Sequence, residues 1–329
     1  MDRILLLLGQ TASGKSAVGR IIARRAGAEI LSLDSMKVYR GMDIGTAKPT
    51  AEEQSEVPHH LIDLVEPTEP FSTGRYLEAF EDALAGVRGR GKTPVVEGGT
   101  ALYAKALIDG LFEGPAADWG LREELKARAA KEGPERLHAE LAAVDPVYAG
   151  KIHPNDVRRV VRGLEVHRLT GNPLSSLHVQ FGSGAGSGRF RIVVLRRSPE
   201  DLRERIRARV KSMFASGWID EAAALLKRHA RLDRTPRQAL GYRAIWRALE
   251  EGRDPRAEEE GIVRATWTFA RKQMGWFKTF PNVAWIDVRP DETVAEIAAR
   301  IEECPRAGGN PNVQIQNPNK LPTPKSQAR

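Results

Sequence analysis

The chain has 329 residues, 41% of them hydrophobic and 29% charged, and a formal net charge of +8. This composition excludes fibrous and wholly disordered proteins, and the length suggests about two globular domains. The single cysteine, Cys304, excludes a disulfide framework, and no apolar run or cleavage-site pattern indicates export, so we expect a cytoplasmic protein with no membrane association.

The first hundred residues alternate between short apolar segments and helical patterns. Strands are predicted at Ile4–Leu8, Glu29–Leu33 and Thr93–Glu97, and helices at Ser16–Ala26 and Arg75–Val87. Strands and helices in this alternating order favour a parallel sheet with helices on both faces. We therefore expect an α/β fold.

A phosphate-binding loop is predicted between the first strand and the first helix. Residues Gly9–Ser16 have the pattern of two glycines followed by Lys and Ser. Glycines let backbone amides turn toward an anion, and the helix N-terminus adds partial positive charge. We expect Lys15 to reach the outer phosphate and Ser16 to hold Mg²⁺. The fold is then a P-loop NTPase-like parallel sheet flanked by helices, although the loop does not define the reaction.

Two further candidates follow predicted strands. Asp34 would lie beside the phosphate loop if the first two strands are neighbours. Three roles are open for a carboxylate at that position: it holds Mg²⁺, it accepts a proton, or it caps a turn. Gly98-Gly99-Thr100 is either a tight turn or a close backbone approach to a substrate. The histidines, including His59-His60, lack metal-ligand spacing and are interpreted as structural or surface residues.

The pattern changes after Gly114-Pro115. Helices at Leu121–Lys131, Pro134–Ala143 and Asp156–Leu169, with no strand among them, predict an all-helical insertion domain that ends at a glycine- and serine-rich linker, Gly182–Gly188. The elements expected after the linker are strands at Phe190–Leu195 and Val283–Ile286 and helices at Pro199–Phe214, Ile219–Lys227, Ala244–Glu250 and Glu258–Phe280.

These patterns divide the chain into four parts. Residues 1–114 are the first part of a P-loop catalytic core, and residues 115–188 are the helical insertion domain. Residues 189–303 are the rest of the core, which is basic and rich in helices. Residues 304–329 are dominated by Pro, Asn, Gly, Gln and Lys and are predicted to be a disordered tail.

All of the basic excess lies in the second half of the chain, because residues 1–150 have a charge balance of −5 and residues 151–329 of +13. Arginine favours bidentate contacts with phosphate, so the asymmetry indicates a nucleic-acid or polyphosphate partner. The alternative is that these arginines are only solvent-exposed residues on the surfaces of helices. The clusters are Arg158, Arg159 and Arg162; Arg205 and Arg209 on one helical face; and Arg271-Lys272 with Trp276-Phe277-Lys278, a mixture suited to stacking on bases.

Seven strings in the chain occur in an order shared with one known family: GQTASGKS, LDSMKVYRGMDIGTAKP, PHHLIDLVEP, VEGGTALY, IHPNDVRRVVRGLEVHRLTG, QALGYRAI and ARKQMGWFK. From about Ile4 to Asp287 the chain resembles the bacterial tRNA dimethylallyltransferases, or isopentenyl-tRNA transferases. The resemblance implies transfer of a dimethylallyl group from dimethylallyl diphosphate to N6 of the adenine immediately 3′ of the anticodon in tRNAs that read codons starting with U. It also implies that the phosphate loop holds this prenyl diphosphate, with Mg²⁺, rather than ATP.

The resemblance implies roles for the candidate residues. Asp34 matches the general base on the adenine N6, and either Arg209 or Arg205 matches a second diphosphate clamp beside Lys15. The implied diphosphate-binding residues are Gly9, Gln10, Thr11, Ala12, Ser13, Gly14, Lys15 and Ser16, with Thr11 and Lys15 also in the catalytic set.

The implied second substrate is the anticodon stem-loop of tRNA, bound in part by the insertion domain. The residues matching its contact segments are Asp34, Ser35, Met36, Lys37, Thr100, Arg122, Arg158, Arg159, Val160, Val161, Arg162, Gln238, Ala239, Leu240, Gly241, Tyr242, Arg243, Arg271, Lys272, Gln273, Met274, Gly275, Trp276, Phe277 and Lys278. As a separate expectation, we predict that the protein is a monomer.

The chain departs from the family's usual residues at several positions. Gln10 stands where Pro is usual, Lys37 where Gln is usual, Gly275 where Thr is usual and Lys278 where Arg is usual. These changes put the fine contacts with the anticodon loop in question. Glu97 is also unusual, as a carboxylate in an otherwise apolar strand, and the sequence assigns it no role.

Three other function classes stay open at this level. An adenylate isopentenyltransferase would share the loop and Asp34 but would have little use for the insertion or the basic half. A P-loop small-molecule kinase would need an Arg-rich lid, and none is recognised between the late strands. A non-enzymatic RNA-binding protein would not need the intact loop with Lys15 and Ser16.

Overall fold

The computed structural model describes residues 3–110, 114–115, 117–177 and 188–304. It has two compact units, one from Met1–Ala106 and Ser187–Arg329 and the other from Leu107–Gly186. The predicted linker, apart from Gly188, and the predicted tail after Cys304 lie outside the described residues. None of the helices in the described ranges is both long and apolar enough to cross a membrane.

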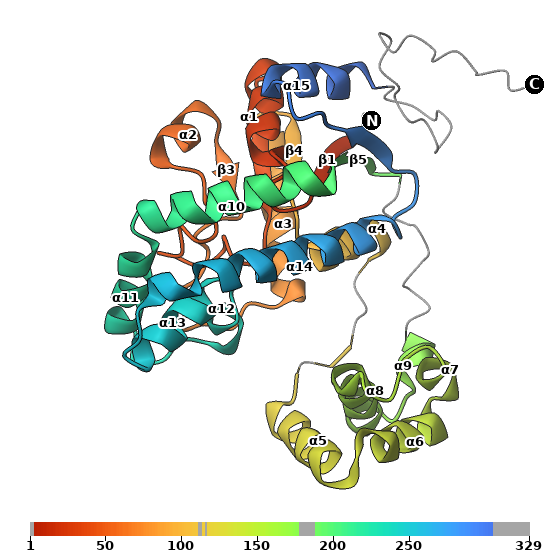
Figure 1. Ribbon diagram of the computed structural model, residues 1–329. Coiled ribbons are helices and arrows are strands. Elements are labelled where there is room, and N and C mark those ends of the chain that lie inside the picture. Colours follow the sequence, from red (N-terminus) through yellow and green to blue (C-terminus); the bar gives the residue numbers. More distant parts are fainter. Residues whose placement is uncertain (1–2, 111–113, 116, 178–187, 305–329) are drawn as a thin grey trace, which may run out of the picture. The chain divides into compact units, whose positions relative to one another are not determined.

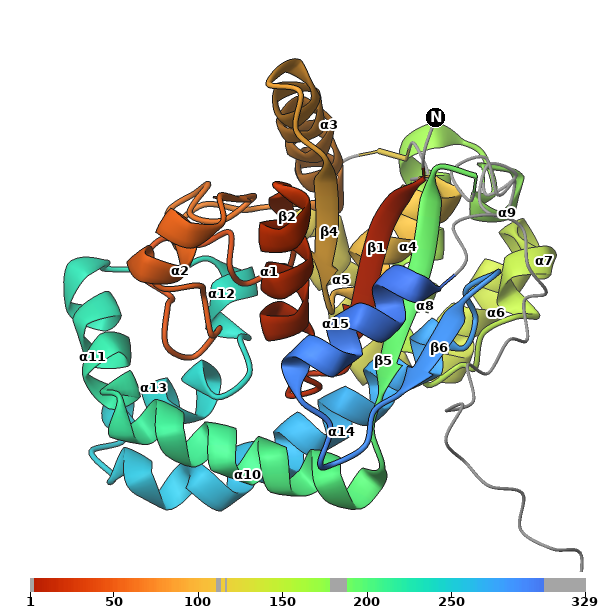
Figure 2. The same cartoon turned by 90° about the horizontal axis from the view of Figure 1, so that it is seen from above.

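The larger unit contains a six-stranded parallel sheet (Figures 1 and 2). The order β3-β2-β4-β1-β5-β6 places β4 between β1 and β2, so the first two strands are not neighbours and the condition stated for Asp34 is not met. A helical crossover can pass over a strand position, and the local pattern does not encode how far it reaches. The strands are β1 (Ile4–Gly9), β2 (Glu29–Leu33), β3 (His59–His60), β4 (Pro94–Gly98), β5 (Phe190–Arg196) and β6 (Ala284–Asp287).

Helices cover both faces of this sheet, which is why β1 is a continuous apolar run rather than an alternating one. Leu5 and Leu7 of β1 pack with α1 (Lys15–Ala26) and α15 (Val294–Glu303) on one face. On the other face lie α3 (Thr73–Gly89) and α4 (Ala101–Asp109), where Tyr76 stacks on Tyr103 and its hydroxyl donates to the carbonyl of Ser32 at 2.9 Å (Figure 1).

Two long helices, α10 (Pro199–Ala215) and α14 (Glu259–Phe277), pack on one another beyond the carboxyl ends of the strands (Figure 2). They, and α11 (Trp218–Arg228) and α13 (Tyr242–Glu250), confirm the predicted helices to within a few residues. The elements that the periodicity missed in this unit are mostly short: α2 (Ala51–Glu56), β3, α4, α12 (Arg234–Arg237), the 3₁₀ turn η2 (Pro255–Glu258) and α15.

The described secondary-structure elements of the smaller unit are all helices. Leu125, Leu137, Leu141 and Leu164 form its core together with Val160. Asp156 caps the third predicted helix by accepting a hydrogen bond from the amide of Arg159 at 3.3 Å. The helices are α5 (Trp119–Glu132), α6 (Pro134–Val144), α7 (Pro146–Ala149), α8 (Val157–Thr170) and α9 (Leu174–Leu177).

Candidate active site

The loop Gly9–Ser16 joins β1 to α1 and forms the base of the site. Gly14 has φ +92°, a left-handed conformation that L side chains rarely adopt, so glycine is required at this turn. The first helical hydrogen bond runs from the amide of Val18 to the carbonyl of Gly14 at 3.2 Å. The amides of Lys15, Ser16 and Ala17 therefore have no acceptor within the helix and are available to an anion.

Helix α14 braces one side of this loop. The Gln273 carboxamide oxygen accepts from the backbone amide of Thr11 at 2.9 Å, and its nitrogen donates to the carbonyl of Gly99 at 2.8 Å. Gln10 donates to the carbonyl of Ala270 at 3.0 Å. Gln273 is thus buried against the phosphate loop and the Gly98-Gly99 turn, although the sequence placed it among tRNA contacts.

The start of α10 and the residues before it brace the other side. The Arg205 Nε donates to the carbonyl of Ala12 at 2.9 Å, and the Arg197 Nε donates to the carbonyl of Ser13 at 2.8 Å. Arg197 is also held by Asp201 at 2.8 Å. Arg205 therefore supports the backbone of the loop.

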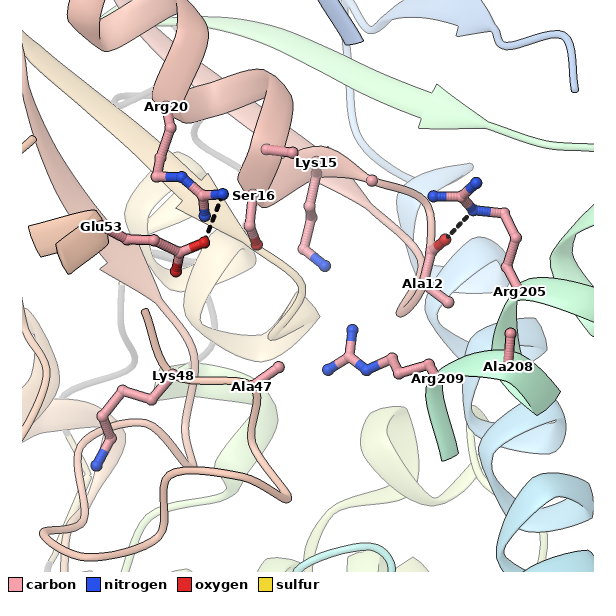
Figure 3. A pocket seen from close by; sticks show the side chains of 12 residues that line it. Ala12, Lys15, Ser16, Arg20, Ala47, Lys48, Glu53, Arg205, Ala208 and Arg209 are labelled. Carbon is pink, nitrogen blue, oxygen red and sulfur yellow. Dashed lines mark hydrogen bonds and ion pairs between the residues drawn. The ribbon is translucent and has the colours of Figure 1, made fainter. Parts of the chain in front are cut away.

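A pocket of about 480 Å³ opens in front of the loop (Figure 3). Arg20 is paired with Glu53 at 2.6 Å, and Lys48 with Asp43 and Asp63, so these cations are neutralised. Lys15 and Arg209 extend toward the centre of the pocket and make no ion pair with other described residues. The lining residues are Ala12, Gly14, Lys15, Ser16, Ala17, Arg20, Ala47, Lys48, Glu53, Arg205, Ala208 and Arg209.

Two carboxylates share the electrostatic environment of these cations. Burial lowers the pKa of the Lys15 amine to about 8; Glu97 and Asp34 oppose this shift, and Arg209 and Lys37 add to it. Burial also lowers the pKa of Arg209, again against the charges of Asp34 and Glu97. Cations and carboxylates are therefore concentrated at one edge of the sheet. Such a site can bind an anion through its cations and accept a proton on a carboxylate.

Asp34 lies directly after β2, in a turn that it stabilises itself. Its Oδ1 accepts hydrogen bonds from the amides of Met36 at 2.8 Å and Lys37 at 3.3 Å. Its Oδ2 has no hydrogen bond among the described residues. The turn-capping role and an available carboxylate oxygen thus coexist in one half-buried side chain.

The turn after β4 is tied to the Asp34 turn. Thr100 Oγ1 accepts from the amide of Ser35 at 3.0 Å, and the amides of Gly99 and Thr100 donate to the carbonyl of Leu33, each at 3.2 Å. A Cβ on Gly98 would lie 2.1 Å from that carbonyl oxygen. The glycine pair therefore allows β2 and β4 to end together, even though β1 and β2 are separated.

Glu97 is the site residue whose role the sequence did not explain. It is the penultimate residue of β4, is 3% exposed, and accepts a hydrogen bond on Oε1 from the Ser16 hydroxyl at 3.0 Å. Among the described residues no group of three or more His, Cys, Asp or Glu side chains is placed to hold a metal. A hydroxyl with a carboxylate nevertheless fits Mg²⁺, which proteins commonly bind through one or two oxygens together with substrate phosphates and waters.

The expected tRNA segments in the larger unit contain both exposed and buried residues. In the Gln238–Arg243 segment, Gln238 and Arg243 are exposed, whereas the Tyr242 hydroxyl is buried and donates to Glu221. On α14, Gln273 and Phe277 point inward and Met274 is half-buried. The exposed residues of that segment are Arg271, Lys272, Gly275, Trp276 and Lys278.

The expected tRNA residues of the smaller unit divide in the same way. Arg122 and Arg162 both bind the fully buried Glu165, at 2.8 and 2.6 Å. Burial alone would raise the pKa of the Glu165 carboxyl, but the hydrogen bonds from these arginines and from the Asp118 amide lower it. Val160 and Val161 are in the core. Arg158 and Arg159 are exposed, and Arg159 pairs with Asp156 at 3.0 Å.

Comparison with known proteins identifies the family. A family model described as IPP transferase matches residues 37–280, and one described as isopentenyl transferase matches residues 2–66. A tRNA dimethylallyltransferase 1 of Trichlorobacter lovleyi is 43% identical over 287 residues, 86% of this chain and 93% of the relative. The tRNA dimethylallyltransferase of Methylococcus capsulatus is 42% identical over 306 residues, 91% of this chain and 97% of the relative.

Solved structures agree with this assignment. The tRNA isopentenylpyrophosphate transferase from Bacillus halodurans has a TM-score of 0.64 and 36% identity, over 92% of this chain and 96% of that one. A eukaryotic dimethylallyltransferase acting on tRNA shares the fold, with a TM-score of 0.71 at 24% identity, over 87% of this chain and 74% of that one. Matched along most of its length in sequence and in structure, the chain belongs to the tRNA dimethylallyltransferases, a family of prenyltransferase enzymes that modify tRNA.

Proposed function

We propose that this protein transfers the dimethylallyl group of dimethylallyl diphosphate to N6 of the adenine immediately 3′ of the anticodon in tRNAs that read codons starting with U. The observation that carries the proposal is the pocket in which Lys15 and Arg209 extend from a braced phosphate loop and α10, within electrostatic range of Asp34. The relatives named tRNA dimethylallyltransferase supply the substrate class.

The reaction breaks the bond between the allylic carbon and the diphosphate oxygen and forms a bond from that carbon to N6. The adenine amino group is a weak nucleophile, so most of the acceleration must come from stabilising the negative charge on the departing diphosphate. Lys15, Arg209 and the amides at the start of α1 surround the place where that charge develops. Asp34 takes the proton that N6 loses, and diphosphate is released.

Mg²⁺ bound at this site would neutralise part of the diphosphate charge, and Ser16 is the residue of the loop that would hold it. Arg205 acts indirectly, because its hydrogen bond to Ala12 keeps the loop amides in position. Gln273 does the same from α14 through its hydrogen bonds to Thr11 and Gly99. Since the far side of α14 carries exposed Arg271, Lys272 and Trp276, one helix would both contact RNA and support the loop.

The acceptor base has to leave its stack to reach the pocket, and protein side chains would take its place. The smaller unit is proposed to hold the anticodon stem, with the enzyme acting as a monomer in the cytoplasm. Arg158 and Arg159 are its candidates for phosphate contacts, whereas Arg122 and Arg162 act mainly in the fold of this unit by neutralising Glu165.

The experiment that tests the proposal offers labelled dimethylallyl diphosphate and Mg²⁺ with unmodified tRNA, AMP or ATP as separate acceptors. Label is expected only in tRNA, on the adenine beside the anticodon. Label in AMP or ATP would instead establish a free-nucleotide isopentenyltransferase. If no acceptor is labelled, the proposal is rejected and ATP becomes the ligand to test in the loop, as for a small-molecule kinase.

The pocket predicts a pH dependence of diphosphate binding. The Lys15 amine is protonated below its pKa of about 8 and loses its charge as the pH rises through that value. Affinity for diphosphate, measured calorimetrically in EDTA, should therefore fall about tenfold between pH 7 and pH 9. A Lys15→Arg variant stays charged over this range and should show no such decline, even if it binds more weakly. A decline of the same size in that variant would assign the titration to another group.

The exposed arginines of the smaller unit predict a salt dependence of tRNA binding. Arg158→Ala should weaken binding of the anticodon stem-loop and reduce the slope of log K against log salt by about one, because one phosphate contact is lost. Arg128→Ala is the matched control, since Arg128 is already neutralised by Glu132 and Glu140. Fluorescence anisotropy at several salt concentrations measures both slopes. An unchanged slope for Arg158→Ala would mean that this arginine is only solvated.

A further inference from the structure

Glu97 is a buried carboxylate in the P-loop site, and within the described part of the chain no side chain forms an ion pair with it. Its side chain packs beside Gly19, where an added Cβ would lie 3.2 Å from the Glu97 Cγ. Its hydrogen-bond donor is the Ser16 hydroxyl, and no Lys, Arg or His of the described residues forms an ion pair with it. Lys15 and Arg209 act on this carboxylate only through space, and a buried carboxylate with no direct ion pair is costly, so the position favours a bound cation.

The hydrogen bond also determines what the Ser16 hydroxyl offers. A serine hydroxyl has one proton to donate and two lone pairs. Because the proton points toward Glu97 Oε1, the lone pairs are left for another electrophile. The two oxygens lie 3.0 Å apart, which is close to the separation of adjacent ligands in an octahedron with metal–oxygen distances of about 2.1 Å. The pair therefore has the spacing of two neighbouring Mg²⁺ ligands.

We propose that Glu97 and Ser16 together form a binding site for a divalent cation, here called the metal seat, and that the cation binds there before diphosphate does. The inference rests on the proposed function in locating the diphosphate at this loop, and it goes further in assigning the metal a protein carboxylate. Lys15 and Arg209 limit the affinity of the seat by charge repulsion, so the metal and the anionic diphosphate are expected to bind cooperatively.

The test compares binding of inorganic diphosphate with and without metal, in the full-length protein. Without metal, the Glu97 carboxylate repels the anion, so Glu97→Gln should bind diphosphate as tightly as the unchanged protein or more tightly. With Mg²⁺, the same variant should bind about tenfold more weakly, because the metal is held less well. Glu97→Val, which suits the neighbouring Val95-Val96 strand segment, should show the same reversal if the fold is kept. A change of equal size and direction in both conditions would overturn the inference.

A second measurement follows the metal alone. Mn²⁺ titrated without diphosphate and followed by electron paramagnetic resonance should bind the unchanged protein about tenfold more tightly than Glu97→Gln. The control is Glu29→Gln. Glu29 is also a buried strand carboxylate, but it lies at the amino end of β2 and is paired with Arg90 and His60. Its Mn²⁺ affinity should match that of the unchanged protein. Equal Mn²⁺ affinities for Glu97→Gln and the unchanged protein would overturn the inference that Glu97 binds the metal.

These readouts are separate from the transfer reaction. If the unchanged protein labels no tRNA while Mn²⁺ and diphosphate still bind as described, the proposed function fails and the metal seat stands. If tRNA is labelled normally but Glu97→Gln leaves the metal dependence of diphosphate binding unchanged, the seat fails and the proposed function stands.

Discussion

Replacing Asp34 by asparagine is expected to lower the rate of dimethylallyl transfer to tRNA about a thousandfold, because the variant removes a general base. The substitution is chosen to leave the turn intact. Asparagine keeps an oxygen that accepts from the amides of Met36 and Lys37, as Asp34 Oδ1 does. Affinity for the tRNA anticodon stem-loop and for diphosphate should stay within a few-fold of the unchanged protein, so the loss should lie in single-turnover transfer under saturating conditions.

Asp34→Ala separates the two roles of this side chain, since it removes both the base and the turn-capping oxygen. The alanine variant should lose transfer to the same extent and should also melt at a lower temperature, because two backbone amides lose their acceptor. If the asparagine variant transfers normally and only the alanine variant fails, then Asp34 acts by holding its turn and another group takes the proton from N6.

Most of the fold could be predicted from local pattern. The phosphate loop, the five longer strands and the principal helices have strong local signals: apolar runs, helical periodicity and cap residues such as Asp156. Short elements such as β3 were missed because two residues carry no period. The order of strands in the sheet was also out of reach, because β4 enters between β1 and β2 through contacts between segments far apart in the sequence.

The site illustrates the same limit at the level of single side chains. Sequence similarity placed Gln273, Val160 and Arg122 in tRNA-contact segments, and it does not say which residues of a segment face inward. In the structure, Gln273 is hydrogen-bonded to the phosphate loop, Val160 packs in a helical core and Arg122 forms an ion pair with the buried Glu165. Glu97 did carry a signal, a carboxylate in an apolar strand, but its partner Ser16 became evident only when β4 was placed beside β1.

The two arginines of α10 that the sequence could not tell apart have different surroundings, and this leads to a second large expected effect. Arg209→Gln should lower the rate constant for transfer by a factor of about a hundred to a thousand, because its guanidinium extends into the pocket without an ion-pair partner among the described residues and would meet the charge on the departing diphosphate. Arg205→Gln should mainly raise the KM for dimethylallyl diphosphate by a few-fold, because Arg205 donates to the carbonyl of Ala12 and holds the loop.

Chemical rescue distinguishes the two arginines further. Guanidinium added to Arg209→Ala should restore part of the transfer rate, since a free cation can enter the pocket and bind the diphosphate. The same addition to Arg205→Ala should restore little, because that variant lacks a tethered link between α10 and the loop rather than a charge facing the ligand. A larger loss of rate in Arg205→Gln than in Arg209→Gln, together with rescue confined to Arg205→Ala, would reverse the assignment and make Arg205 the clamp. Initial rates with tRNA saturating and dimethylallyl diphosphate varied give both constants for each variant.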